Sequence, residues 1–311
     1  MVMPISVAVW LVLLCLPVSA EAVSAWQLTG SANVGFSTYR DSPKADSQTE
    51  FSAFVDGQYL DGLGGGAGYI RQDRNASSRN RLTNNIIYLG AWKAFYTDVI
   101  PGRISVLLDS YTVNGNVEQG KGKGAAAATQ ADTDNIDIIN PTLIYMNADK
   151  DLSLELSYAR SRLASVNAAV ADVTVRQWTP AVALFINDRY DRIYLRHYAI
   201  DLSNDSRATN ITHTTGTELK WTHWARAGGT GLRDVTVALF AGERLYGVDR
   251  EARRVDCFPE KLTGAANIGT TWGLSQASAF YAYAGLERYA NADDGSRFTA
   301  GYLYLGARRQ W

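Results

Sequence analysis

The histidines are the first residues to examine for chemistry, and the chain has three of them: His197, His213 and His223. A hydrolytic site needs a histidine beside a nucleophile or an orienting carboxylate. His213 stands in the stretch THTTGTE, and no paired Asp-His or His-x-Ser is evident along the sequence. We therefore predict that the chain is not an enzyme, and a hydrolase is the third function class considered.

Other chemical motifs are also missing from the sequence. No His, Cys and Asp cluster has zinc-site spacing, and the glycines of DGLGGG are not followed by Lys-Ser/Thr. The net charge of −1 gives no basic field for nucleic acid. Cys257, in the polar stretch RRVDCFPEK, is predicted to be a structural thiol in a loop. The sequence thus predicts no metal, no cofactor and no nucleic-acid partner.

Tyrosines and charged residues recur at every second position in several segments. In a β-strand this spacing places them on one face. Aromatic rings can stack on the apolar faces of sugars, and charged groups can bond to sugar hydroxyls. The residues predicted for this polar face are Tyr281, Tyr283, Glu287, Tyr289, Tyr302, Tyr304, Tyr194, Arg196, Tyr198, Glu218, Lys220 and Asp109. The alternative is that the tyrosines only fill space and hydrogen-bond across strands.

The elements that would position these residues are long alternating strands. Residues 26–39, WQLTGSANVGFSTY, have one apolar and one polar face. This segment is longer than a typical strand of a globular protein. A tilted membrane strand needs about 9–11 residues. Fourteen strands are predicted, near 26–39, 49–60, 66–73, 81–95, 102–114, 134–147, 151–162, 172–187, 191–202, 211–225, 232–247, 261–274, 277–290 and 297–311. Twelve or sixteen strands are the alternatives.

The links between these strands alternate between short turns and longer polar segments, as in outer-membrane barrels. The longest, residues 115–133, is small, polar and low in complexity. It predicts a mobile external loop, with a plug folded into the lumen as the alternative. Residues 248–260 are predicted to be another of the long polar links.

A membrane barrel explains these strands better than a soluble sandwich does. The polar face carries mid-strand charges that a wet lumen can solvate, and closure satisfies every strand edge. Aromatic residues gather at the ends of the apolar faces, where a membrane interface favours them. These predicted interface residues are Trp26, Tyr59, Tyr145, Trp178, Trp221 and Trp272. The predicted fold is therefore an all-β, antiparallel, up-and-down transmembrane barrel.

The beginning of the sequence has the layout of a cleaved signal peptide. Val7 to Val18 is apolar and uncharged, and Val18-Ser19-Ala20 offers a cleavage site. We predict a signal peptide over residues 1–20 and a single barrel domain over residues 21–311.

The terminal stretch RFTAGYLYLGARRQW resembles the C-terminal assembly signal of Gram-negative outer-membrane proteins. The resemblance implies an outer-membrane location, contact with outer-membrane lipid or lipopolysaccharide, and recognition of Trp311 by the barrel-assembly machinery. Arg309 departs from the pattern, which usually has an apolar residue two before the end. The chain also resembles YaiO-like barrels linked to surface polysaccharides, although no diagnostic motif supports that subfamily.

Fourteen strands enclose more space than the filled eight-stranded barrels. The first hypothesis is therefore a porin-like channel for passive or facilitated diffusion of small polar solutes, with saccharides as the class that the tyrosine face suits. The alternative is a barrel component of polysaccharide export or another surface assembly. The mixed signs of the lumen charges argue against strong ion selectivity.

Overall fold

The computed structural model describes residues 26–42, 45–59, 62–75, 81–97, 99–118, 134–165, 172–203, 211–225, 230–292 and 294–311. The predicted signal peptide over residues 1–20 and nearly all of the 115–133 loop lie outside these ranges. In the described residues, no helix is long and apolar enough to cross a membrane.

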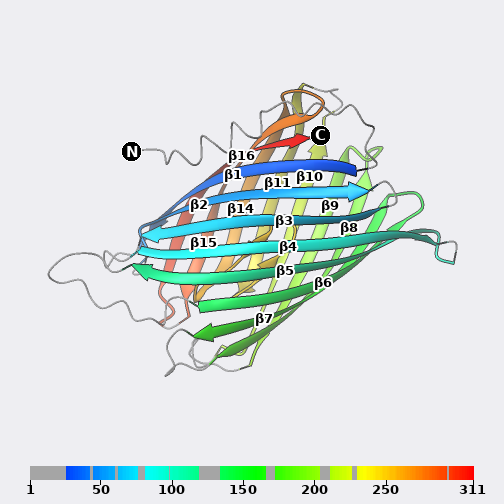
Figure 1. The fold of residues 1–311 in the computed structure, drawn as a ribbon. Helices are drawn as coiled ribbons and strands as arrows, with labels where there is room; N and C mark the ends of the chain where they lie inside the picture. Colours follow the sequence, from blue (N-terminus) through cyan, green and yellow to red (C-terminus); the bar gives the residue numbers. More distant parts are fainter. Residues whose placement is uncertain are drawn as a thin grey trace.

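Fourteen antiparallel strands form one closed barrel, as predicted (Figure 1). Its strands are β1 (Trp26–Arg40), β2 (Ser47–Tyr59), β3 (Leu63–Asn75), β4 (Arg81–Thr97), β5 (Gly102–Glu118), β6 (Asp134–Asn147), β7 (Leu152–Ser165), β8 (Val173–Ile186), β9 (Asp191–Leu202), β10 (His213–Trp224), β11 (Gly231–Arg244), β14 (Glu260–Gly273), β15 (Ser278–Asn291) and β16 (Arg297–Gln310). A separate pair, β12 (Val248–Asp249) and β13 (Arg254–Val255), lies between β11 and β14.

The barrel closes where β1 pairs with β16. Val34 lies opposite Leu305, and the pairing continues to Arg40 opposite Thr299. The backbone of Trp311 extends it, because its N–H donates to Leu28 at 2.9 Å and its carbonyl accepts from Leu28 at 3.3 Å. No strand edge of the barrel therefore remains open, which is the requirement that lipid imposes on a spanning sheet.

The connections are short at one end of the barrel and mostly longer at the other. The strand start at Trp26 and the strand end at Gln310 share the short-turn end with links such as 148–151 and 187–190. The opposite end carries links such as 203–212 and 245–259. We call the two ends of the barrel the short-turn end and the long-loop end. In outer-membrane barrels the short turns are periplasmic.

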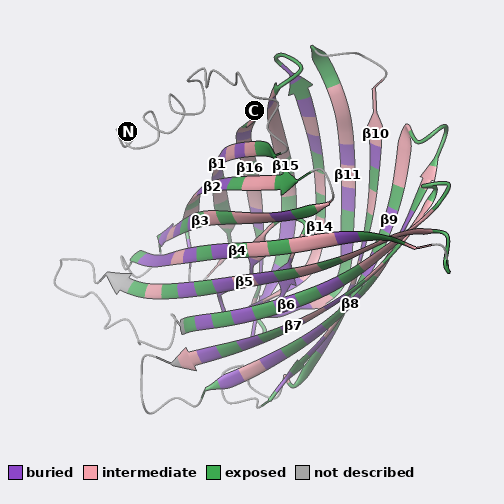
Figure 2. Ribbon diagram, turned by 45° about the vertical axis from the view of Figure 1, so that its right-hand side comes forward, coloured by how far each residue is buried: buried purple, intermediate pink, exposed green. Residues whose placement is uncertain are grey.

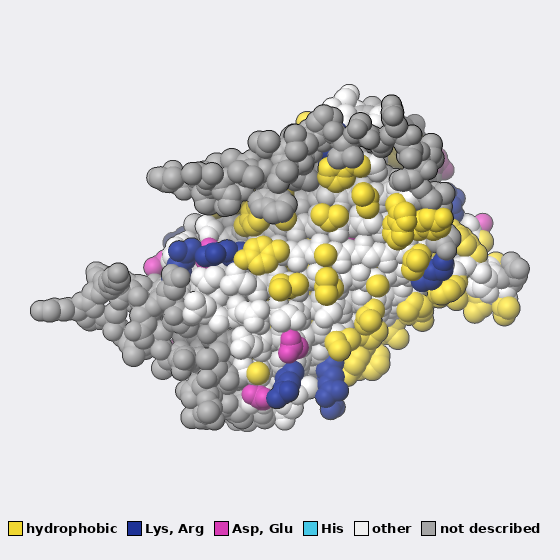
Figure 3. Space-filling view, viewed as in Figure 1, with side chains coloured by type: hydrophobic (Ala, Val, Ile, Leu, Met, Phe, Trp, Pro, Cys, Tyr) yellow, Lys and Arg dark blue, Asp and Glu magenta, His cyan; other side chains and the backbone are white. Residues whose placement is uncertain are grey.

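The two wall faces exchange polarity along β5 to β9. Near the short-turn end the apolar residues point outward, as the alternation predicted, and Leu154 and Leu184 are exposed. Near the long-loop end buried and exposed positions alternate along these strands (Figure 2), and the exposed ones are mostly polar (Figure 3). The buried, inward residues there form an apolar cluster. The inward members of this sector are Tyr111, Val113, Ile136, Ile138, Leu163, Val173, Val175, Ile200 and Leu202.

This inversion departs from the prediction of a polar lumen face throughout. Where the strands extend beyond the hydrocarbon core of the membrane, their outer face is in contact with water. The apolar side chains there point into the barrel, as they point into the core of a soluble protein. The long-loop half of the interior is therefore partly a packed core rather than an open pore.

Candidate functional site

The connection between β11 and β14, residues 245–259, folds into the barrel, and we call it the lumen hairpin. Its two short strands are β12 and β13. Residues 248–260 were predicted to be a long polar link, and that expectation is wrong because the apolar side chains of the connection are buried inside the barrel. These are Leu245, Tyr246, Val248, Val255, Cys257 and Phe258. The hairpin is the feature that decides what the interior can do.

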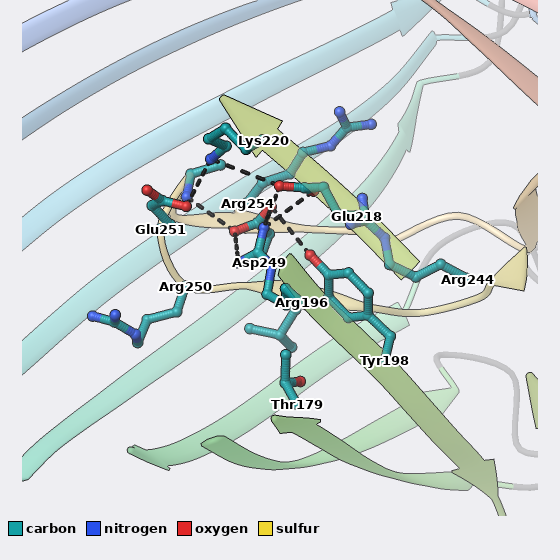
Figure 4. Close-up of polar contacts among 12 residues, drawn as sticks. Thr179, Arg196, Tyr198, Glu218, Lys220, Arg244, Asp249, Arg250, Glu251 and Arg254 are labelled. Carbon is teal, nitrogen blue, oxygen red and sulfur yellow. Dashed lines mark hydrogen bonds and ion pairs between the residues drawn. The ribbon is translucent and has the colours of Figure 1, made fainter. Parts of the chain in front are cut away.

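Asp249 anchors the hairpin to β9 and β10 (Figure 4). The two terminal guanidinium nitrogens of Arg196, Nη1 and Nη2, donate to the Asp249 carboxylate, each at 2.9 Å. The same guanidinium also donates to Glu218 at 3.0 Å, and Tyr198 reaches Asp249 at 3.5 Å. The buried guanidinium of Arg196 therefore links a carboxylate of the hairpin to a carboxylate of the wall, and Asp249 loses this ion pair if the hairpin leaves.

Arg253 anchors the hairpin to the opposite wall. Its guanidinium donates to Asp56 of β2 at 2.6 Å and lies 4.7 Å from the ring centroid of Phe54. In the closed strand order, β2 and β9 are separated by six strands in either direction. Contacts to both strands mean that the hairpin spans the full width of the lumen.

Three further ion pairs tie the hairpin to the intervening walls. Arg250 donates to Glu155 of β7 at 3.2 Å, and Arg254 donates to Glu287 of β15 at 2.7 Å. Glu251 accepts from Lys220 of β10 at 2.7 Å. Together with Arg196 and Asp56, these contacts form an ion-paired ring around the hairpin.

Gln177 of β8 holds the hairpin backbone directly. Its side-chain amide donates to the Val248 carbonyl at 2.8 Å and accepts from the Val248 N–H at 2.9 Å. This pair of bonds imitates the backbone ladder of a sheet. It satisfies backbone polar groups that burial would otherwise leave unpaired.

The wall charges hold the hairpin carboxylates in the ionised form. Burial raises the pKa of Glu251, but the positive charges of Lys220, Arg196 and Arg192 outweigh it and lower the pKa to about 2. Burial opposes ionisation of Asp249 in the same way, and Arg196 and Arg244 hold the pKa of that carboxyl below its usual range. The hairpin ion pairs therefore persist at neutral and mildly acidic pH.

The backbone of the hairpin is held in an unfavourable conformation at two positions. Tyr246 has a φ of 54° and Arg253 a φ of 50°, both in the left-handed region that few side chains adopt. Such conformations persist only where surrounding contacts over-determine them, and they concentrate at switch regions. The ring of ion pairs supplies those contacts.

Most of the residues predicted for the lumen face point inward, but they divide into two groups. Near the hairpin and the long-loop end they are buried rather than free. This group comprises Asp109, Tyr194, Arg196, Tyr198, Glu218, Glu287 and Tyr289. Asp109 accepts from Tyr88 at 2.8 Å, and the others lie beside or bond to the hairpin or its anchors.

The second group remains half-buried on the short-turn side of the hairpin. It comprises Lys220, Tyr281, Tyr283, Tyr302 and Tyr304. We call the space that the four tyrosines line the vestibule. It is the part of the predicted polar face that is not fully buried.

Each vestibule tyrosine packs over a glycine on a neighbouring strand. Tyr302 lies opposite Gly285, whose Cβ, if present, would be 2.7 Å from the Tyr302 hydroxyl. The other pairs are Tyr281 with Gly306, Tyr283 with Gly269, and Tyr304 with Gly35. The glycines leave room for the rings against the wall, since a Cβ at each of these positions would overlap the tyrosine.

The predicted interface aromatics are partly exposed on the outer wall. The rings of Trp26 and Tyr59 contact each other in a tilted arrangement, with centroids 5.4 Å apart, near the short-turn end, where Tyr145, Trp221 and Trp272 also lie. Trp178 stands alone among the six, nearer the long-loop end, and its ring is tilted against that of Tyr158 with centroids 4.6 Å apart. Five of the six thus lie at one depth, as expected of an aromatic band at one membrane interface.

The structure also pairs histidines that looked isolated in the sequence. His213 lies 2.7 Å from Asp201, and His223 lies 2.8 Å from Asp191. Both pairs join β9 to β10 across the sheet, so a search along the sequence could not find them. Among the described residues neither histidine has a hydrogen bond to a serine or cysteine, so the pairs supply no nucleophile.

The sequence did not predict the buried hairpin because the high charge density of this segment indicates a solvent-exposed loop. The stretch DREARRVD has six charged residues of eight, which is typical of a solvated loop. The partners that neutralise it lie on β2, β7, β9, β10 and β15, far away in sequence. The flanking apolar residues in LYGV and CF were the one available signal for burial.

No family model matches the chain, and no curated protein matches it. Solved structures do: CymD, described as a monoaromatic hydrocarbon channel, superposes with a TM-score of 0.54 at 8% identity over 91% of this chain and 88% of its own. A TodX mutant, another monoaromatic hydrocarbon channel, gives 0.53 at 12% identity over 93% and 91%. A bacterial polysaccharide outer membrane secretin gives 0.51 at 13% identity over 91% and 98%. The chain therefore has the fold of outer-membrane β-barrel proteins.

Proposed function

We propose that this protein is an outer-membrane channel for small polar solutes, with saccharides as the favoured class, and that the lumen hairpin closes it. The observation that carries the proposal is the vestibule, where four half-buried tyrosines pack over glycines on the short-turn side of the ring of ion pairs. Flat aromatic faces bind the apolar faces of sugar rings, and nearby charges bond to sugar hydroxyls.

The charge ring supports a channel that opens by hairpin movement. The hairpin is held by ion pairs, by one glutamine and by its buried apolar side chains. Displacement exchanges the paired charges for water-solvated ones and exposes the apolar side chains to the lumen. Such contacts can break and re-form without unfolding the wall, whose strands are paired independently of the hairpin. The same ring, with both signs of charge, gives little preference for cations or anions.

Conductance and solute entry test this proposal. The purified protein in planar bilayers and in liposomes is compared with a variant in which residues 249–254 are replaced by Gly-Ser-Gly. We expect low or intermittent conductance for the parent protein, and stepwise conductance with saccharide entry for the variant. If neither protein conducts at any voltage and both exclude saccharides, the channel proposal is wrong.

A second candidate, a component of polysaccharide export, is favoured by the direction in which the vestibule opens. The accessible tyrosines lie on the short-turn side, which is the periplasmic side in outer-membrane barrels, whereas the long-loop half is packed. A polysaccharide secretin is among the proteins with a similar fold. Loss of surface polysaccharide in cells without this protein, together with capture of a periplasmic partner, would favour export over free diffusion.

A further inference from the structure

The outer wall of β7 and β8 carries a column of cross-strand pairs that changes from apolar to cationic. Leu156 lies opposite Pro180, and Tyr158 lies opposite Trp178. The next pair on the same face is Arg160 opposite Arg176. With a rise of about 3.4 Å per residue, the arginines stand about 7 Å beyond the aromatic pair along the strands. This depth corresponds to the headgroup level if the aromatics mark the membrane interface.

The two arginines face each other, and Asp201, which lies opposite Arg176 on β9, forms its contact with His213 rather than with either arginine. Both are exposed on the outer wall, and in the described part of the chain neither has a hydrogen-bond or ion-pair partner. Directly opposite residues of an antiparallel pair have Cβ atoms about 4.5–5.5 Å apart, and like charges at that distance are destabilising. An anion bound between the guanidinium groups removes this repulsion.

The acidic groups nearby are engaged elsewhere. Asp172 accepts from Arg162 at 3.0 Å, and Asp201, opposite Arg176 on β9, is bonded to His213 at 2.7 Å. Asp137 lies opposite Arg162, one row further from the membrane side. The Arg160–Arg176 row thus presents two unpaired positive charges above a continuous apolar surface.

We propose that Arg160 and Arg176 bind the phosphate of a lipid headgroup in the outer leaflet. Two adjacent guanidinium groups present parallel N–H donors that match phosphate oxygens bidentately. Tyr158 and Trp178 then lie beneath the headgroup, and Leu156 and Pro180 contact its acyl chains. A phosphorylated glycolipid fits this column better than free phosphate, because only the lipid uses the aromatic and apolar rows.

This proposal depends on the outer-membrane location but not on whether the lumen conducts. A barrel that never opens would still bind the lipid, and a working channel could lack the site. The binding experiment and the conductance experiment therefore fail independently.

Native mass spectrometry of the purified barrel with a bis-phosphorylated lipid A-type glycolipid tests the site. We expect one tightly bound lipid on the parent protein and binding weaker by about tenfold or more in Arg160→Gln/Arg176→Gln, since two charge-assisted contacts are lost. The dephosphorylated glycolipid should bind the parent protein as weakly as it binds the variant. Inorganic phosphate at the same concentration should not displace the lipid.

The matched control is Arg40→Gln/Arg288→Gln, which removes the same charge. Arg40 and Arg288 are exposed near the same end, but Thr299 of β16 separates them. Unchanged lipid binding in the Arg160/Arg176 variant, equal loss in the control, or equal binding of the dephosphorylated lipid would each overturn the proposal. Displacement by inorganic phosphate would show an anion site that does not recognise lipid. Unfolding curves for each variant separate lost binding from lost folding.

Discussion

Arg196 on the barrel wall and Asp249 on the lumen hairpin form a bidentate ion pair, with both N···O distances at 2.9 Å. The pair joins residues 53 positions apart in sequence and lies in the interior. Both charges are buried, and Asp249 has its hydrogen-bonded ion pair with Arg196, whereas Arg196 also pairs with Glu218 of the wall. The docking of the hairpin should therefore respond strongly to the loss of either charge.

The Asp249→Asn substitution should undock the hairpin. Arg196 keeps Glu218 as a partner, so the expected cost is that of the lost charge-assisted contact, about 1.5–3 kcal/mol, which corresponds to a shift of about tenfold or more in the docking equilibrium. Cys257, buried within the hairpin, is the natural reporter, because burial also raises the pKa of its thiol. With Cys15 replaced by serine wherever the leader is retained, we expect slow maleimide labelling of the parent protein and much faster labelling of the variant.

The control for this prediction is Asp149→Asn, in an exposed short turn. It removes the same charge without touching the hairpin, so labelling of Cys257 should stay slow. Equal labelling rates in Asp249→Asn and the parent protein would show that the ion pair does not hold the hairpin.

Hairpin docking should be insensitive to pH between 7 and about 4.5. The native pKa of Glu251 is lowered to about 2, against about 4.3 for a free glutamate. A lowered native pKa contributes stability that is fully present above the free value and is lost as pH falls toward the native value. Conductance and Cys257 accessibility, measured at several pH values with a pH-independent thiol probe, should change only below about pH 4. A transition near pH 6 would contradict this assignment.

The Gly269→Ala substitution should destabilise the barrel by displacing a vestibule tyrosine. A Cβ at this position would overlap the ring of Tyr283, and overpacking of this kind typically costs about 1–3 kcal/mol. The measurement is the free energy of unfolding in urea. The double variant Gly269→Ala/Tyr283→Ala should recover part of the loss, because the clash is gone. If the single variant is as stable as the parent protein, the tyrosine does not lie against the glycine.

Truncating the last side chain, Trp311→Ala, should reduce assembly more than stability. The Trp311 backbone makes the two closing bonds to Leu28, and alanine keeps both. The resemblance of the terminal strand to an assembly signal implies that the aromatic ring is needed earlier, during recognition. The measurement is the fraction of heat-modifiable barrel in isolated outer membranes. Trp26→Ala, an aromatic at the same end, is the control, and equal loss in both would argue against a signal role.

The alternation of residue types was sufficient to predict the barrel wall. In β8, Trp178, Val182, Leu184 and Ile186 face outward and Gln177 and Thr179 inward. A period of two is a local property of consecutive residues, so it can be seen in the sequence and predicts both the strand and its faces. The number of strands followed from counting these segments and the alternating links.

The interior could not be predicted in the same way. Residues 245–259 are as charged as a solvated loop, and their burial depends on Asp56, Glu155, Arg196, Lys220 and Glu287 arriving from five different strands. Local sequence does not encode which distant charges meet, because closure of the barrel brings them together. The sequence alone determined which residues point inward, since strand geometry fixes that at each position. Only the tertiary structure decided that they hold a hairpin across the lumen, because pairing of buried charges depends on distances through space.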